Sequence, residues 1–153
     1  MSTWTQRFHL ATTIGGGFTG LAVGLATLLS NWPQMKVLAV LLVLAYCLLC
    51  VWSISVGIRL AENGNVGPEL RFFYLIQIPY FTTPALSFHV GLGFMLYIGT
   101  LSTGRNVQAQ LGADWNTALL HGDGWLFAIN VVPILVLWLM RRSNKSLERT
   151  REG

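Results

Sequence analysis

Cys47 and Cys50 form a CxxC motif, the spacing used by thiols that exchange disulfides. That chemistry needs thiolates that form in water. Here the pair lies near the middle of an uncharged run between Lys36 and Arg59, and the chain contains two cysteines in all. Two thiols also fall short of the three or four ligands of a zinc site. The motif therefore predicts buried thiols that pack as small apolar side chains, with membrane redox chemistry as an alternative.

His89 is an ionisable side chain inside a long apolar segment. No Asp, Glu, Lys or Arg occurs between Arg71 and Arg105. Because an ionisable group inside a bilayer is costly, we expect its side chain to face other helices or a wet cavity. Three roles are open: a proton-relay or solute contact, a haem ligand, or a neutral imidazole hydrogen-bonded to another helix. A second histidine for haem is not expected at the same depth, since His9 and His121 are expected at opposite membrane interfaces.

Asn130 is the other polar side chain that would be costly inside a bilayer, near the middle of the apolar run 124–140. It is the natural partner for His89, for Ser87 or for a free backbone carbonyl. These three residues predict a small polar pocket between helices, which is the candidate site. The sequence contains no paired intramembrane carboxylates and no phosphate-binding loop, and it predicts no catalytic residue, metal or cofactor.

The stretch GGGFTGLAVG contains Gly16, Gly20 and Gly24 at steps of four residues. A dinucleotide-binding loop would need a soluble strand and helix and an acidic residue about twenty positions on. The flanks here are apolar, and the next carboxylate after Gly24 is Glu62. On a helix these glycines share one face, which allows close packing in a membrane. That face is expected to pack within its own bundle or against a partner copy.

The composition indicates lipid as the main surroundings of the chain. Of the 153 residues, 53% are hydrophobic and 10% are charged, against about 25% charged in soluble domains. The net charge is +4, and five of the ten Lys and Arg residues fall after Met140. No basic face with interleaved aromatics is present, so nucleic acid is not an expected partner. The expected partners are the bilayer, another membrane protein or further copies of this chain.

Uncharged runs predict an all-α fold, an integral membrane bundle of four transmembrane helices within residues 1–140. A crossing needs about 20 residues, with about 17 as the lower limit. Prolines at positions 79 and 84 interrupt the third run, so residues 70–81 are expected to form a short interfacial or re-entrant segment. Residues 102–122 are expected to form an outer loop, and residues 141–153 a disordered basic tail. The expected spans are about 11–29, 37–58, 83–101 and 124–140.

The Lys and Arg bias predicts the orientation in a cell inner membrane. With four crossings and both termini inside, eight of the ten basic residues lie on the cytoplasmic side. Lys36 and Arg105 are the two that remain outside.

Three classes of function follow. The first and favoured class is an accessory or interaction protein that assembles through helix packing and has no catalytic activity of its own. The second is an oligomeric small-solute transporter or channel component that uses the polar pocket at His89 and Asn130. The third is a membrane redox protein that uses Cys47 and Cys50 or haem.

Overall fold

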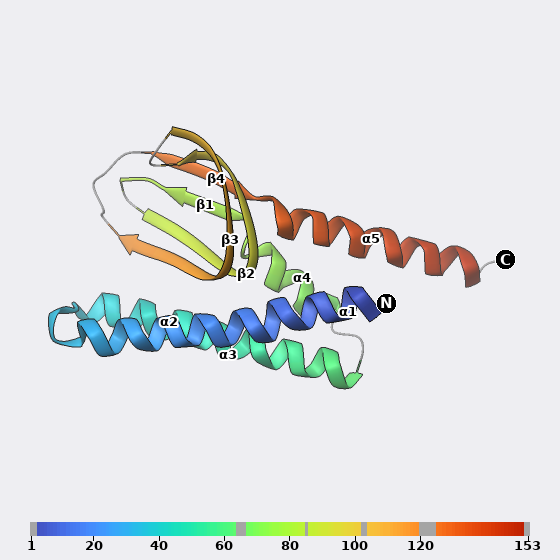
Figure 1. Cartoon of the computed structure of the whole chain (residues 1–153), viewed down its shortest axis with the longest axis horizontal. Coiled ribbons are helices and arrows are strands. Elements are labelled where there is room, and N and C mark those ends of the chain that lie inside the picture. Colours follow the sequence, from blue (N-terminus) through green and yellow to red (C-terminus); the bar gives the residue numbers. More distant parts are fainter. Residues whose placement is uncertain (1–2, 64–66, 85, 102–103, 120–124, 152–153) are drawn as a thin grey trace.

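The computed structural model describes residues 3–63, 67–84, 86–101, 104–119 and 125–151. Figure 1 shows a pair of antiparallel helices, a curled antiparallel sheet above them, and a helix that leads away to the C-terminus. The expectation of an all-α bundle of four transmembrane helices is therefore wrong. The first two predicted spans are helical, whereas most of the third and the start of the fourth are strands.

The helix pair is built from the most apolar part of the chain. α1 (Thr3–Leu10), a π-helical turn (Ala11–Gly15) and α2 (Gly16–Asn31) form one continuous helical rod. A short 3-10 turn (Trp32–Gln34) reverses the chain, and α3 (Val37–Asn63) returns alongside α2. Residues 4–34 and 37–63 are long and apolar enough to cross a membrane. Within the described residues, these are the two helical stretches with that property.

Two further helices occupy positions that the sequence analysis assigned differently. α4 (Gly67–Leu75) and the start of the sheet share residues 70–81, in place of the expected interfacial or re-entrant segment. α5 (Val131–Arg151) starts inside the expected fourth span and continues through the tail that was expected to be disordered. The two helices pack against each other beside the end of the helix pair at which the N-terminus lies (Figure 1).

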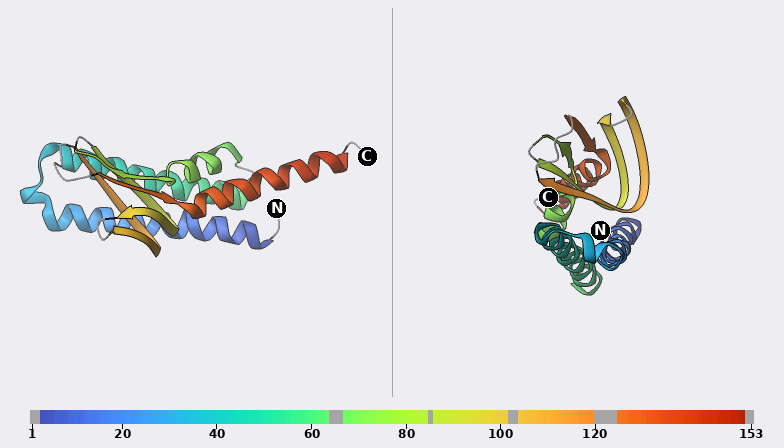
Figure 2. Two further views of the ribbon diagram at one scale, coloured as in Figure 1. Left: turned by 90° about the horizontal axis from the view of Figure 1, so that it is seen from above. Right: turned by 90° about the vertical axis from the view of Figure 1, so that its left-hand side faces the viewer.

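The sheet contains β1 (Pro79–Thr82), β2 (Leu86–Leu101), β3 (Gly104–Leu119) and β4 (Leu126–Asn130). β2 and β3 form a long hairpin that occupies both the third expected span and the expected outer loop. β1 pairs with the first part of β2, β4 pairs with its last part, and β1 and β4 pair with each other. β2 therefore has to curl so that both of its ends reach the same pair of short strands (Figure 2).

Alternation explains why residues 104–119 are a strand. From position 107 to 116, apolar side chains at odd positions alternate with polar ones or glycine at even positions. This period of two is the signature of a strand with one polar and one apolar face.

A pair of glycines bends the long hairpin. Gly93 has φ +90° and Gly112 has φ +125°, and the two residues are paired across β2 and β3. Residues that carry a Cβ atom rarely adopt such positive φ values, so glycine is needed on both strands. We refer to this pair as the glycine bend.

The glycine bend sits directly on the start of α2. A Cβ atom added to Gly16 would lie 2.7 Å from the backbone nitrogen of Gly93, and one added to Gly93 would lie 2.9 Å from Cγ2 of Thr12. The segment that follows α4 contacts the same place, because Gln77 Oε1 accepts a 2.9 Å hydrogen bond from the backbone N–H of Leu92. Backbone meets backbone here, which leaves no room for a side chain.

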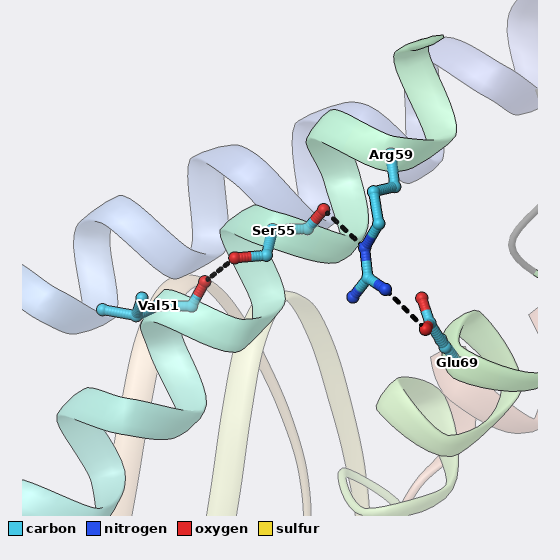
Figure 3. Close-up of polar contacts among 4 residues, drawn as sticks. All are labelled: Val51, Ser55, Arg59 and Glu69. Atoms are coloured by element: carbon cyan, nitrogen blue, oxygen red, sulfur yellow. Dashed lines mark hydrogen bonds and ion pairs between the residues drawn. The ribbon is translucent and has the colours of Figure 1, made fainter. Parts of the chain in front are cut away.

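An ion pair joins α3 to α4 (Figure 3). Arg59 Nη1 donates to Glu69 Oε1 at 2.7 Å, while Arg59 Nε donates to the carbonyl of Ser55 at 3.4 Å. Ser55 in turn donates its hydroxyl proton to the carbonyl of Val51. Both charged side chains are partly exposed, so the pair is worth at most about 1 kcal/mol and serves mainly to orient α4.

The contact between Gly16 and the glycine bend predicts opposite effects for two neighbouring substitutions. Gly16→Ala should destabilise the protein by about 1–3 kcal/mol, because the new methyl group has to push the hairpin away. Gly15→Ala is the matched control, because a Cβ atom at Gly15 would meet nothing within 4 Å. It should stabilise the helix by up to about 1 kcal/mol. Thermal unfolding in mild detergent measures both, and equal effects would contradict the contact.

Candidate functional site

The curled sheet has a polar inner face and an apolar outer face. Residues that are paired directly across an antiparallel sheet point to the same side, so the register assigns each side chain away from the glycine bend. Described side chains of the inner face are Tyr80, Thr82, Ser87, His89, Met95, Tyr97, Gln108, Gln110, Asp114, Asn116 and Asn130. Those of the outer face include Phe81, Phe88, Val90, Phe94, Ile98, Val107, Leu111, Trp115, Phe127 and Ile129.

The outer face is apolar even where nothing in the described structure covers it. Val90 and Trp115 pack toward the helix pair, with the Trp115 ring stacked on Tyr46 at 4.8 Å between centroids. Val107 and Leu111, in contrast, are 67% and 70% exposed. Antiparallel sheets of water-soluble proteins usually bury their apolar face and expose their polar one. Beyond the helix pair, this sheet instead leaves apolar side chains exposed, while Ser87, His89 and Asn130 of its polar face are buried.

The glycine bend brings two distant residues of one strand together. His89 and Tyr97 are eight residues apart, which corresponds to about 26 Å along a straight strand. Here His89 Nε2 and the Tyr97 hydroxyl form a hydrogen bond, and the two ring centroids lie 4.8 Å apart. The ring of Tyr80 completes the cluster at 4.4 Å from the His89 ring. A flat hairpin could not form this site.

Asp114 supplies a carboxylate beside the imidazole. It is paired with Gly91 across the hairpin, and its Oδ2 lies 3.8 Å from His89 Nδ1, which is an ion-pair distance rather than a hydrogen bond. The His89 side chain is 3% exposed and that of Asp114 is 40% exposed. The carboxylate thus lies between the solvent-accessible surface and the buried ring.

The surroundings shift the protonation of these groups in defined directions. Burial lowers the pKa of His89, and the carboxylate of Asp114 opposes this shift by raising the same pKa. Burial also raises the pKa of the Tyr97 phenol, with a further contribution from Asp114. Tyr97 therefore keeps its proton at neutral pH and can donate it to His89 Nε2.

Asn130 connects the sheet to α5. Its Oδ1 accepts hydrogen bonds from the backbone N–H of Leu96 at 3.0 Å and of Val132 at 3.3 Å. The second of these is the bond of a helix N-cap. Two backbone donors fix the orientation of the amide, and Nδ2 is buried without a partner among the described residues.

The three residues of the predicted polar pocket lie in one sheet, but they are not hydrogen-bonded to one another. His89, Asn130 and Ser87 are all buried. Ser87 bonds to Thr82 at 2.9 Å, His89 to Tyr97, and Asn130 to backbone groups. The expected helical setting was wrong for His89, which lies in β2, and for Asn130, which ends β4.

Two partners of His89 were not recognised in the sequence. Asp114 falls within residues 102–122, which were expected to form an outer loop, whereas it lies in β3. Tyr97 falls within the expected third span, about 83–101, and was not selected as a site residue. The signal that could have identified both is the period-two alternation from 107 to 116, together with glycines at facing positions of a hairpin.

Two glycines of the predicted packing face, Gly20 and Gly24, lie against the CxxC motif of α3. A Cβ atom on Gly20 would lie 2.7 Å from Cys50 Sγ, and one on Gly24 would lie 2.6 Å from Cys47 Sγ. Gly16 instead faces the glycine bend. Both cysteines are buried and carry free thiols.

A second polar cluster surrounds the π-helical turn. His9 Nδ1 and the Tyr74 hydroxyl lie 2.7 Å apart, and that hydroxyl lies 2.9 Å from Thr12 Oγ1. Thr13 donates its hydroxyl proton to the carbonyl of His9, and Ser53 donates to the carbonyl of Thr13. His9 was expected at a membrane interface, yet it is fully buried between the helices.

Within the described part of the chain, no group of three or more His, Cys, Asp or Glu side chains is placed to hold a metal ion. No family model, no curated protein and no solved structure matches this chain. The functional assignment therefore rests on the geometry of the curled sheet.

The hydrogen bond between Tyr97 and His89 predicts unequal effects for two Tyr→Phe substitutions. Tyr97→Phe should cost about 1–2 kcal/mol, because it leaves a buried ring nitrogen without a partner. Tyr80→Phe keeps the ring contact with His89, and its hydroxyl makes no hydrogen bond within the described residues, so its effect should be below about 0.5 kcal/mol. Thermal unfolding at pH 8 compares the two variants. Similar losses would show that the Tyr97 hydroxyl is not bonded to His89.

Proposed function

We propose that this chain is a membrane-embedded protein that lines part of the pathway of an oligomeric small-solute transporter or channel. The observation that carries the proposal is the sidedness of the curled sheet. Its outer face exposes Phe94, Val107 and Leu111, while its inner face holds His89 and Asp114. An apolar outside suits lipid, and a polar inside suits a solute or water.

The position of the sheet supports a place at membrane depth. The bent hairpin lies against α2, which together with α3 is apolar enough to cross a membrane (Figures 1 and 2). Non-helical backbone is tolerated at that depth where it is buried in protein or lines a wet cavity. The hairpin fits the first condition where it packs on α2, and the proposal places its polar inner face beside water.

The open shape of the sheet supports an assembly of several copies. Among the described strands, β3 pairs with β2 alone, so its other edge is unpaired. Unpaired backbone groups are costly in lipid. A pathway with walls on all sides therefore needs a further copy of the chain or a partner.

The orientation that accompanies this proposal has two crossings of a cell inner membrane, by residues 4–34 and 37–63, with both termini cytoplasmic. Arg7, Arg59 and Arg71 lie toward the end of the helix pair that holds the N-terminus, and Lys36 lies at the opposite turn. This distribution follows the excess of basic residues on the cytoplasmic side of membrane proteins.

Reporter fusions test the orientation. A fluorescent protein that folds only in the cytoplasm should be bright when fused to either terminus, because an even number of crossings places both ends on one side. Alkaline phosphatase, which is active only outside, should be inactive at both positions and active when inserted at Lys36. A phosphatase signal at either terminus would contradict two crossings with cytoplasmic ends.

A second candidate function is the accessory role without catalytic activity that the sequence favours. The free edge of β3 and the exposed Leu111 beside it support that role, because both could receive a strand or helix of another membrane protein. Copurification in mild detergent separates the candidates. A stoichiometric foreign partner favours the accessory role, and a pure homo-oligomer favours the pathway.

Solute flux tests the proposed function with a matched pair of variants. Proteoliposomes that contain the purified protein should equilibrate glycerol or urea faster than empty liposomes, as measured by light scattering after an osmotic jump. Gln110→Trp fills the inner face and should remove most of that flux. Leu111→Trp makes the same substitution one residue away on the outer face and should leave the flux unchanged. Equal flux with and without protein, for both solutes, would overturn the proposal.

A further inference from the structure

We infer that the inner face binds a proton, held on His89 with Asp114 as its counter-ion. The inference deepens the proposed function, on which its meaning for transport rests, by naming the ion that the pathway handles. The binding of the proton itself can be measured without transport.

The partners of the two ring nitrogens differ. A neutral imidazole has one N–H donor and one acceptor nitrogen. A carboxylate accepts and does not donate, so the N–H of the neutral ring lies on Nδ1, which faces Asp114 at 3.8 Å, and Nε2 accepts from the Tyr97 hydroxyl. This arrangement fixes the tautomer of the neutral ring.

Proton uptake follows from that tautomer with a simple balance. One proton from a hydronium ion in the surrounding water adds to the lone pair of Nε2, so an N–H bond forms while an O–H bond of the hydronium ion breaks and a water molecule is left. The Tyr97 hydroxyl then turns and accepts a hydrogen bond from Nε2 in place of donating one. The new imidazolium charge is compensated by the carboxylate of Asp114, and release is the reverse of uptake.

Every strand around His89 contributes to this environment. β1 presents the ring of Tyr80, β2 presents Tyr97, and β3 presents Asp114 together with Asn116, which is paired with His89. β4 places Ala128 opposite Tyr80. Among these described neighbours, Asp114 is the one ordinarily charged group, and its partly exposed side chain connects the buried ring to water.

Close packing around His89 favours a proton over a larger ligand. The space left by Gly91 is filled, because a Cβ atom placed there would lie 2.5 Å from the Tyr97 hydroxyl. Met95 and Tyr97 belong to the same buried cluster on this face. A proton needs no cavity and can bind to His89 without displacing these side chains.

Nitrogen NMR of the full-length protein with ¹⁵N-labelled histidine, in detergent or bilayers between pH 4 and 8, tests the inference. The His89 signals, assigned by their loss in His89→Gln, should shift from the neutral to the charged pattern as the pH falls. Asp114→Asn should weaken proton binding to His89 by about tenfold, since an opposite charge at this distance shifts the pKa of a group by about one unit or more. Asp114→Glu restores the charge and should recover most of the affinity.

Glu69→Gln is the matched control, because it removes one carboxylate, on α4, that pairs with Arg59 of α3 and is not part of this site. It should leave the His89 titration unchanged. A His89 that stays neutral until the protein unfolds, or that titrates identically with and without Asp114, overturns the inference. Titration as expected without any solute flux would refute the proposed function alone, and flux with a silent His89 would refute the proton site alone.

Discussion

The architecture depends on one close contact between backbones, that of Gly16 with the glycine bend of the long hairpin. Gly93 and Gly112 turn both strands through a conformation that favours glycine, and α2 offers a surface without side chains on which the turn can rest. Because β2 bends at this point, its two ends reach the same pair of short strands. A Cβ atom at Gly16 would lie 2.7 Å from the backbone nitrogen of Gly93 and would force the hairpin to shift.

The site is a direct consequence of the bend. His89 lies four residues before Gly93 and Tyr97 lies four residues after it, so folding the strand back places both rings on the concave side. Asp114 reaches the same place from the partner strand, two residues beyond Gly112. Gln108, Gln110 and Asn116 of β3 line this side, while Val107, Leu111 and Trp115 turn outward. Chemistry and membrane compatibility thus arise from the same alternation of side chains.

The sequence predicts some of this and not the rest. The helix pair was predicted because long uncharged runs at positions 10–34 and 37–58 leave few alternatives to an apolar helix. The prediction for the third run was wrong because the absence of charge was taken as evidence of a helical span, although glycines at 91, 93 and 99 disfavour a helix. His89 was selected correctly as an unusual side chain, but its partners depend on where the hairpin bends. That position is marked by Gly93 and Gly112, and their pairing becomes visible only once the register of the hairpin is known.

The most direct test of this account is a distance between two side chains of β2. Magic-angle-spinning NMR on the protein in lipid bilayers, with labelled histidine and tyrosine, detects rings that lie close in space. On a straight strand these two rings would be about 26 Å apart. The account predicts a cross-peak between the imidazole of His89 and the ring of Tyr97, which disappears in Tyr97→Phe labelled in the same way. An absent cross-peak with helical carbon shifts at residues 86–101 would contradict the bent hairpin and would restore a helical third span.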